Sequence, residues 1–310
     1  MRYAVAHGRR SGRGGAAVLG AAAVSVLRRA DHEVVEVETD SLDEARDRCT
    51  ELLADGLDAL VVAGGDGAVS LATDLCAGSS TAVGILPAGT GNDAARSLRI
   101  PTRPDDALRV LVTGHRRTLD TIRVRGEGDV RGAGIDRHVL GSVNAGLDAR
   151  IAHRATLLPR RLGAATYTLA ALVEIARLRW TPELRYHLTL VHPDGATTDE
   201  ELTALVLAPA NLPFLGGGLH LAPQADPQDG LLDLVTIGPL SPTRALVLLR
   251  AVRAGRHTGM TEVSVRRVRE VRIAGPADVL AHGDGEELAP LPLTISAVLR
   301  NLQVIAPPLA

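Results

Sequence analysis

Strand-like and helix-like segments alternate through the first third of the chain. Short apolar runs followed by helical patterns mark strands at 2–6, 33–39, 58–63 and 82–86 and helices at 16–30, 41–56, 68–77 and from 92. Ser41 and Glu44 form a capping box at the start of one of these helices. This alternation predicts βαβ units and a parallel sheet, whose ligands bind at the carboxyl ends of its strands.

The pattern changes near Thr118. Seven strand-like segments follow, at 118–126, 137–146, 183–195, 201–211, 230–238, 262–275 and 293–307, together with helices at 161–180 and 241–255. Turn residues separate the strands, so we expect them to pair mainly antiparallel. The sequence therefore predicts a second, mostly antiparallel β domain.

Composition excludes several classes of protein. The 310 residues carry a formal net charge of -2 and only 2% aromatic residues, which argues against a nucleic-acid-binding protein. The chain contains no lysine, so a Walker phosphate loop, a protein-kinase-type site and Schiff-base chemistry are all excluded. No G-x-G-x-x-G follows the first strand, which disfavours a nicotinamide dehydrogenase.

Cysteine usage and hydropathy bear on the compartment. Cys49 and Cys76 are far apart and lack metal-ligand spacing, which favours two inert thiols in a reduced setting. The first 15 residues lack the apolar core of a signal peptide, and no apolar run approaches the ~18 residues that span a bilayer. We expect a cytoplasmic protein that at most contacts the inner face of a membrane.

The strand at 58–63 ends in the sequence GGDG, residues 64–67, which opens a helix. Backbone N–H groups and the positive end of the helix dipole converge there, as in phosphate-binding turns. Asp66 would repel a phosphate unless a magnesium ion lies between them or the carboxylate faces a substrate hydroxyl. A tight strand-to-helix turn with Asp66 as N-cap is the structural alternative.

The next strand ends in a similar turn, PAGTGND, residues 87–93. Gly89 and Gly91 allow close backbone approach, Thr90 offers a hydroxyl, and Asn92 and Asp93 open another helix. Two such turns on neighbouring strands indicate one nucleotide lying across the edge of the sheet.

Five motifs occur in the order typical of one family. They are GGDG, PAGTGND, VNAGLDARIA (143–152), NLPFLGGGLHLAPQADPQDGLLDL (211–234) and HGDGEEL (282–288). In this order they resemble the diacylglycerol kinase catalytic family, which includes bacterial soluble lipid kinases and sphingosine kinases. The resemblance implies an ATP-binding α/β domain with a parallel sheet, formed by residues 1–118 with 296–310 returning to it. It also implies a mostly antiparallel C-terminal β-sandwich domain at 119–295, with the active site between the two.

The resemblance also implies roles for individual residues. Asp66 would help to hold a catalytic magnesium ion or position the acceptor hydroxyl, and either Asp284 or Glu286 would be the general base. Asp229, with the carbonyls of Asp226 and Leu231, would hold a structural magnesium ion. The nucleotide-binding residues expected are Ser11, Gly12, Thr39, Gly64, Gly65, Asp66, Gly67, Ala68, Gly89, Thr90, Asn92 and Asp93.

The chain departs from the family pattern at three places. The usual Asn-Pro after the first strand is replaced by Gly8 and Arg9, a Thr by Ala68, and a Phe by Ala94. Because arginine pairs with phosphate in a bidentate manner, Arg9, Arg10 and Arg13 are candidates to replace the lost contacts.

The predicted function is an ATP- and magnesium-dependent lipid kinase. Its expected partner is a lipid alcohol, most directly diacylglycerol, at a membrane surface, and no nucleic acid is expected. Arg177, Arg179 and Trp180 at the end of helix 161–180 would face anionic headgroups, unless that helix simply packs on the second domain. A homodimer is left open. The alternative functions are an NAD kinase-like kinase of a soluble acceptor and a non-catalytic relative that binds nucleotide or lipid.

Overall fold

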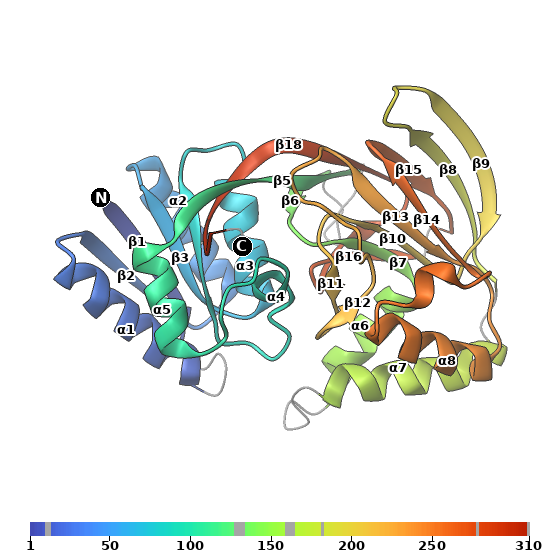
Figure 1. Ribbon diagram of the computed structural model, residues 1–310, viewed down its shortest axis with the longest axis horizontal. Coiled ribbons are helices and arrows are strands. Elements are labelled where there is room, and N and C mark those ends of the chain that lie inside the picture. The colour runs from blue at the N-terminus through green and yellow to red at the C-terminus, as the bar shows by residue number, and fades with distance from the viewer. Residues whose placement is uncertain (10–13, 127–133, 159–164, 181–182, 277–278, 309–310) are drawn as a thin grey trace. The chain divides into compact units, whose positions relative to one another are not determined.

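The chain divides into two compact units, each with its own sheets and core. The computed structural model describes residues 1–9, 14–126, 134–158, 165–180, 183–276 and 279–308. Unit 1 is Met1–Thr121 with Leu299–Ala310, and unit 2 is Ile122–Val298 (Figure 1).

Unit 1 contains a parallel sheet, as the sequence predicts. Its strands lie in the order β2 (Glu33–Thr39), β1 (Arg2–Gly8), β3 (Ala59–Gly64) and β4 (Ala82–Pro87). The last part of β18 (Leu293–Ala306) adds one more parallel strand beside β4. The helices of this unit are α1 (Gly15–Arg29), α2 (Leu42–Ala54), α3 (Asp66–Cys76), α4 (Asp93–Ser97) and α5 (Pro104–Thr113).

Burial in the core of unit 1 accounts for the apolar runs of two strands and for the state of its two cysteines. Every residue of β3 and β4 is buried, which is why these strands are continuous apolar runs rather than alternating ones. Cys49 and Cys76 are free and buried, and burial raises the pKa of their thiols to about 11 and about 12. Both are protonated near pH 7, so they behave as the inert thiols that the sequence predicts.

Unit 2 is a sandwich of two mainly antiparallel sheets, again as predicted. One sheet has the order β14 (Val263–Val268), β13 (Leu232–Ile237), β10 (Val206–Ala210), β7 (Val143–Gly146), β16 (Leu280–Gly283) and β17 (Glu286–Pro290). The other contains β15 (Glu270–Ala274), β8 (Arg185–Val191) and β9 (Thr197–Thr203), next to the first part of β18. β5 (His115–Gly126) pairs with β6 (Ile135–Val139). The core between these sheets includes Ile122, Tyr186, Leu188, Leu207 and Leu234.

A helical layer covers the outer face of the first sheet of unit 2. It consists of α6 (Leu147–Leu157), α7 (Ala165–Arg177) with the short η3 (Leu178–Trp180), and α8 (Pro242–Arg253). Their inward side chains pack on Val206, Ala208, Val235 and Ile237, while Leu207 and Leu234 face the sandwich core. β10 and β13 are therefore buried on both faces. Smaller elements are β11 (Phe214–Leu215), β12 (Leu219–His220) and η4 (His257–Gly259).

Several boundaries differ from the sequence prediction. Segment 262–275 is two strands, β14 and β15, which belong to different sheets, and 137–146 is likewise divided between β6 and β7. α5 and α6 were not predicted from the sequence. Among the described residues, none of the helices combines the length and the apolar character needed to cross a bilayer.

Candidate functional site

The two glycine-rich turns of unit 1 lie against each other at the carboxyl edge of its sheet. Gly64 at the end of β3 pairs in register with Pro87 at the end of β4, and the Ala88 amide donates to the Gly64 carbonyl over 2.8 Å. A Cβ added to Gly89 would lie 2.3 Å from the Gly65 Cα atom. Only glycine at this position lets the two backbones approach so closely.

Asp66 joins the two turns through its carboxylate. Its Oδ1 atom accepts hydrogen bonds from the amides of Asp93, at 2.7 Å, and Ala94, at 3.3 Å. Asp66 opens α3 but caps α4, a helix that begins 27 residues later in the chain. The N-terminus of α3 itself receives no side-chain cap, because the capping position is Gly65. Of the two helix N-termini expected to bind phosphate, the structure thus leaves that of α3 uncapped by a side chain.

Asn92 fixes the second turn. Its backbone is left-handed, with φ of 54°, its Oδ1 atom accepts from the Gly89 amide at 3.0 Å, and its Nδ2 atom donates to the Gly89 carbonyl at 2.8 Å. Thr90 is exposed at the tip of this turn and Asp93 is buried below it. Gly67 and Ala68 are half-buried in the first turn of α3.

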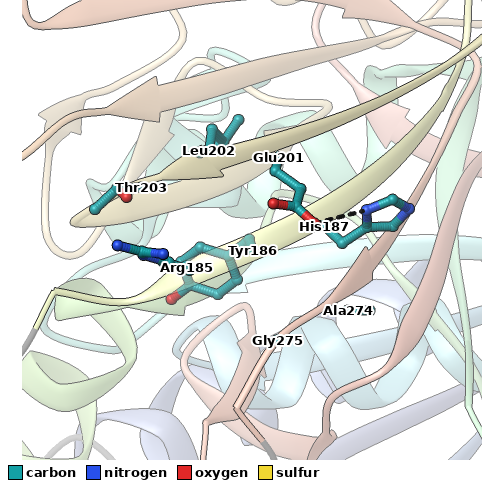
Figure 2. Close-up of a pocket in the computed structure, with 8 residues that line it drawn as sticks. All are labelled: Arg185, Tyr186, His187, Glu201, Leu202, Thr203, Ala274 and Gly275. Atoms are coloured by element: carbon teal, nitrogen blue, oxygen red, sulfur yellow. Dashed lines mark ion pairs between the residues drawn. The ribbon is translucent and has the colours of Figure 1, made fainter.

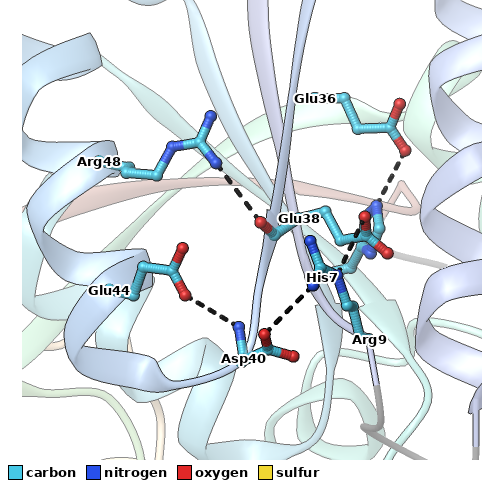
Figure 3. Close-up of polar contacts among 7 residues, drawn as sticks. All are labelled: His7, Arg9, Glu36, Glu38, Asp40, Glu44 and Arg48. Carbon is cyan, nitrogen blue, oxygen red and sulfur yellow. Dashed lines mark hydrogen bonds and ion pairs between the residues drawn. The ribbon is translucent and has the colours of Figure 1, made fainter.

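Arg9, just after β1, is held by two carboxylates at the end of β2 (Figure 3). Its guanidinium group lies 3.3 Å from both Glu38 and Asp40. Its amide donates to the carbonyl of Thr39, a buried residue, over 3.1 Å. Arg9 was a candidate from the sequence to reach nucleotide phosphates, whereas the structure pairs it with these two carboxylates. Arg10, Ser11, Gly12 and Arg13 lie outside the described residues.

In unit 2, Asp284 lies in the turn of the β16–β17 hairpin. The φ angles of Asp284 and Gly285 are 49° and 87°, both left-handed, as in a tight two-residue hairpin turn. The Asp284 carboxylate accepts hydrogen bonds from three successive amides: that of Leu140 at 3.0 Å, that of Gly141 at 3.0 and 3.2 Å, and that of Ser142 at 3.1 Å. Both carboxylate oxygens are therefore occupied by backbone donors.

This group of backbone amides around Asp284 was not predicted from the sequence. A Cβ on Gly141 would lie 2.5 Å from Oδ1 of Asp284, so the carboxylate occupies the space that a side chain would fill. The available signal was a glycine inside the predicted strand 137–146, because such a glycine often marks the close approach of another group.

The other polar residues of the hairpin differ in exposure. Glu286, the first residue of β17, is exposed. His282 is 4% exposed, and its burial lowers the pKa of the imidazole, although Glu287, whose Oε1 atom lies 3.9 Å from Nε2, acts in the opposite direction. His282 is therefore neutral near pH 7.

The loop expected to hold a structural magnesium ion is closed by an arginine. One carboxylate oxygen of Asp229 accepts from the Leu231 amide at 2.9 Å, and the other pairs with the guanidinium of Arg267. Asp226 accepts from the Gln228 amide at 3.1 Å. Among the residues that the structure describes, no group of three or more His, Cys, Asp or Glu is arranged to hold a metal ion. With both oxygens of Asp229 engaged, these contacts lend no support to a magnesium ion here, and the expected set of one carboxylate and two backbone carbonyls stays a prediction.

A cavity of about 500 Å³ lies elsewhere in unit 2 (Figure 2). Its walls come from β8, β9 and the end of β15, and Nδ1 of His187 lies 4.0 Å from a carboxylate oxygen of Glu201 at its side. It is lined by Arg185, Tyr186, His187, Glu201, Leu202, Thr203, Ala274 and Gly275, none of which the sequence analysis selected for the site.

Two family models match successive parts of the chain. Residues 2–124 match the model described as the diacylglycerol kinase catalytic domain. Residues 141–306 match the model described as the YegS C-terminal NAD kinase beta sandwich-like domain. Together the two models span most of both units.

Known proteins agree with these family models. A protein of Mycobacterium tuberculosis named diacylglycerol kinase is 37% identical over 300 residues, which cover 96% of this chain and 92% of that protein. The crystal structure of a diacylglycerol kinase from Bacillus anthracis superimposes with a TM-score of 0.70 at 18% identity, covering 99% of this chain and 97% of the other. The structure of yeast NADH kinase in complex with NADH gives a TM-score of 0.55 at 12% identity, covering 99% and 84%. The two structures show likeness of fold alone.

Proposed function

This chain belongs to the diacylglycerol kinase family of phosphotransferases, and we propose that it transfers the γ-phosphate of ATP to the hydroxyl group of a lipid, most directly diacylglycerol. The name of the Mycobacterium tuberculosis relative supports this acceptor, because the two chains are 37% identical over nearly their whole lengths. A lipid acceptor in turn requires that the protein work at a membrane surface.

The observation that carries the nucleotide part of the proposal is the pair of glycine turns in unit 1. Asp66 directs its Oδ1 atom to the amides of α4, so this oxygen does not compete for the uncapped N-terminus of α3. The first amides of α3 and its dipole favour an anion there, such as a phosphate group of ATP. This resolves the conflict that a carboxylate between two phosphate-binding glycines would otherwise create.

Glu286 fits the role of general base better than Asp284. Both oxygens of Asp284 accept backbone hydrogen bonds, which stabilise the negative charge and leave little capacity to take a proton. Glu286 is exposed on the same hairpin, two residues further along the chain. We assign Glu286 to proton removal from the lipid hydroxyl and Asp284 to holding the hairpin in place, as a positioning residue.

Magnesium is the expected companion of ATP. When bound with the nucleotide, it would neutralise charge on the phosphate oxygens. In unit 1, Oδ2 of Asp66 accepts no hydrogen bond from the described part of the chain and suits a hard cation. No step of the proposed reaction depends on the Asp229 loop, because Arg267 already supplies a positive charge there.

The test is transfer of labelled γ-phosphate from ATP to a panel of lipids in mixed micelles. We expect a labelled lipid with the wild-type protein, and a turnover lower by about 10²–10⁴-fold in Glu286→Gln, because a general base contributes that much. Glu287→Gln is the matched control. It changes the neighbouring carboxylate, which lies 3.3 Å from His153 and 3.9 Å from His282, and should retain turnover within a few-fold.

Three results would contradict the proposal. Labelling of soluble diols or of NAD in preference to any lipid would identify a kinase of soluble acceptors. ATP binding without transfer to any acceptor would identify a non-catalytic relative. Full activity of Glu286→Gln, together with none in Asp284→Asn at equal folded fraction, would return the role of base to Asp284.

A further inference from the structure

The outer face of α7 has the opposite polarity to that of an ordinary surface helix. Ala170, Ala171 and Ile175 face inward in the core of the helical layer, as expected. The outward side chains, however, include Leu169 and Leu172, which are 41% and 42% exposed. A surface helix normally places polar residues on this side.

The orientation of α7 is fixed by its acidic residue, which points inward. Glu174 is 1% exposed, and its carboxylate pairs with Arg150, at 3.2 Å, and with Arg154, both on α6. Rotating α7 to bury its leucines would expose a different face and break this buried charge cluster, which is costly. The packing of α7 therefore fixes Leu169 and Leu172 in exposed positions.

The neighbouring helix α8 continues the apolar surface. Ala245, Leu248 and Val252 are buried, whereas Leu246 and Val247 are 39% and 48% exposed. α7 and α8 pack side by side, and the Arg253 guanidinium donates to the Thr168 hydroxyl over 2.7 Å (Figure 1). We name these residues, Leu169, Leu172, Leu246, Val247 and the exposed Arg250, the α7–α8 patch.

The exposed charged side chains that α7 and α8 themselves contribute have one sign. In the described residues of α7 and α8 the only acidic side chain is Glu174, which is buried and paired. α8 carries Arg244, Arg250 and Arg253, of which Arg244 is paired with Glu262. An apolar surface on two helices that carry arginine and no exposed carboxylate of their own is complementary to a bilayer that contains anionic lipids.

We propose that the α7–α8 patch is the surface by which this protein docks on an anionic lipid bilayer, with the leucines entering the interfacial region and Arg250 contacting lipid headgroups. The choice of a bilayer as the partner rests on the proposed function, because a kinase of a lipid alcohol must reach its substrate at such a surface. A second copy of the chain fits the patch less well. Two-fold dimers bring identical surfaces together, so the arginines of one copy would meet those of the other without carboxylates between them.

Docking is tested by sedimentation with sucrose-loaded vesicles in the absence of ATP. The vesicles are phosphatidylcholine alone or with phosphatidylglycerol. We expect the partition coefficient on anionic vesicles to fall at least about tenfold in Leu169→Gln/Leu172→Gln, since two apolar side chains no longer enter the interface. Arg250→Gln should weaken binding to anionic vesicles about fivefold and leave binding to neutral vesicles unchanged.

Val112→Gln is the matched control. Val112 is 45% exposed on α5 in unit 1, outside the patch, and this variant should bind vesicles like the wild type. The proposal is overturned if the wild type does not bind anionic vesicles, or if the double leucine variant binds as well as the wild type. It is also overturned if that variant changes only the oligomeric state in sedimentation velocity, because the patch would then join two copies.

Failure of docking and failure of the proposed function are distinguishable. Phosphorylation of a short-chain diacylglycerol below its critical micelle concentration needs no membrane, so the patch variants should retain wild-type turnover on it. A protein that binds vesicles but phosphorylates no lipid would support docking and contradict the kinase proposal. A protein that phosphorylates the short-chain lipid but does not bind vesicles would support the kinase proposal and contradict docking.

Discussion

Asp66 in unit 1 and Asp284 in unit 2 look alike in sequence. Each follows a strand, each has glycine on both sides, and each belongs to a motif that the sequence associates with catalysis. In the structure both carboxylates accept backbone amides from a distant segment, 27 and 28 residues away for Asp66 and 142 to 144 residues away for Asp284. Asp66 uses one oxygen for two amides, whereas Asp284 uses both oxygens for three.

This difference separates two roles for an aspartate in a glycine turn. A carboxylate with one oxygen bound to amides can cap a helix and still offer the second oxygen to a cation or hydroxyl. A carboxylate with both oxygens bound to amides holds backbone segments together and has little capacity left for another partner. Because asparagine keeps one oxygen but replaces the other with an NH₂ donor, it should substitute well for the first kind and poorly for the second.

The largest effect is expected for Asp284→Asn. Its NH₂ group would face an amide donor of Leu140–Ser142, which would lose its acceptor, so we expect the free energy of unfolding to fall by roughly 3 kcal/mol. Urea denaturation followed by circular dichroism measures this change. Asp194→Asn is the control, since within the described part of the chain the Asp194 side chain accepts only the Ala196 amide, in an exposed turn, and it should change stability by less than about 0.5 kcal/mol. A loss at 284 no larger than the control would remove the distinction between the two aspartates.

Gly89→Ala tests the contact that brings the Asp66 turn to its neighbour. The added methyl group would lie 2.3 Å from the Gly65 backbone, so the turns must separate, and we expect a loss of about 2 kcal/mol and weaker ATP binding. Gly15→Ala, at the start of α1 with open space around its Cα atom, is the control and should be neutral or slightly stabilising. Denaturation and ATP titration calorimetry of both variants give the comparison. Normal ATP affinity in Gly89→Ala would show that nucleotide binding does not need the close turns.

Asp66 should tolerate replacement by asparagine with little loss of stability, whereas Asp284 should not. Asp66→Ala removes the cap of α4 and should cost about 1 kcal/mol, whereas Asp66→Asn keeps an oxygen for the amides and should cost only a few tenths. Both variants should lose lipid phosphorylation if the charge of Asp66 serves the reaction. Activity and denaturation measured on the same preparations separate the two roles. If Asp66→Asn lowers the free energy of unfolding as much as Asp284→Asn does, the number of carboxylate oxygens bound by amides does not decide the cost of the substitution.

Strands and helices that depend on neighbouring residues were predictable from local sequence patterns. The parallel sheet of unit 1 followed from apolar runs that end at glycines, and α2 from the Ser41–Glu44 capping box, whose hydrogen bond is present at 3.1 Å. α5 was predictable but missed, although Pro104 at its start, acidic residues in its first turn and Gly114 at its end all indicate a helix. Here the signal was in the sequence and was not used.

The partners of the site residues were not predictable in this way. The bonds from Asp66 to α4 and from Asp284 to Leu140–Ser142 join segments far apart in the chain, and no local pattern encodes them. The same holds for Arg9, whose carboxylate partners lie on the adjacent strand β2 and just after it. A resemblance to a family names the residues of a site, but which oxygen of each remains available depends on tertiary contacts.

A third carboxylate, Glu262, sharpens the comparison because a guanidinium holds it instead of amides. Arg244 contacts it through Nε at 2.6 Å and Nη2 at 3.0 Å, and this hydrogen-bonded pair lowers the pKa of Glu262 from 4.5 to about 2. A carboxyl group whose pKa is lowered by folding stabilises the protein above its unfolded pKa, and that contribution is lost as the pH falls from 4.5 through about 2.

Wild type should therefore exceed Glu262→Gln in stability at pH 7, by the smallest margin of the series because the pair is solvent-exposed, and the margin should narrow over that pH range. It should also shrink in 0.5 M salt, which screens an exposed ion pair, while the loss in Asp284→Asn should persist because backbone hydrogen bonds are screened much less. Urea denaturation of both variants at two salt concentrations and a series of pH values measures this. A margin at Glu262 that is independent of pH and salt would mean that packing of the side chain, and not its charge, provides the stabilisation.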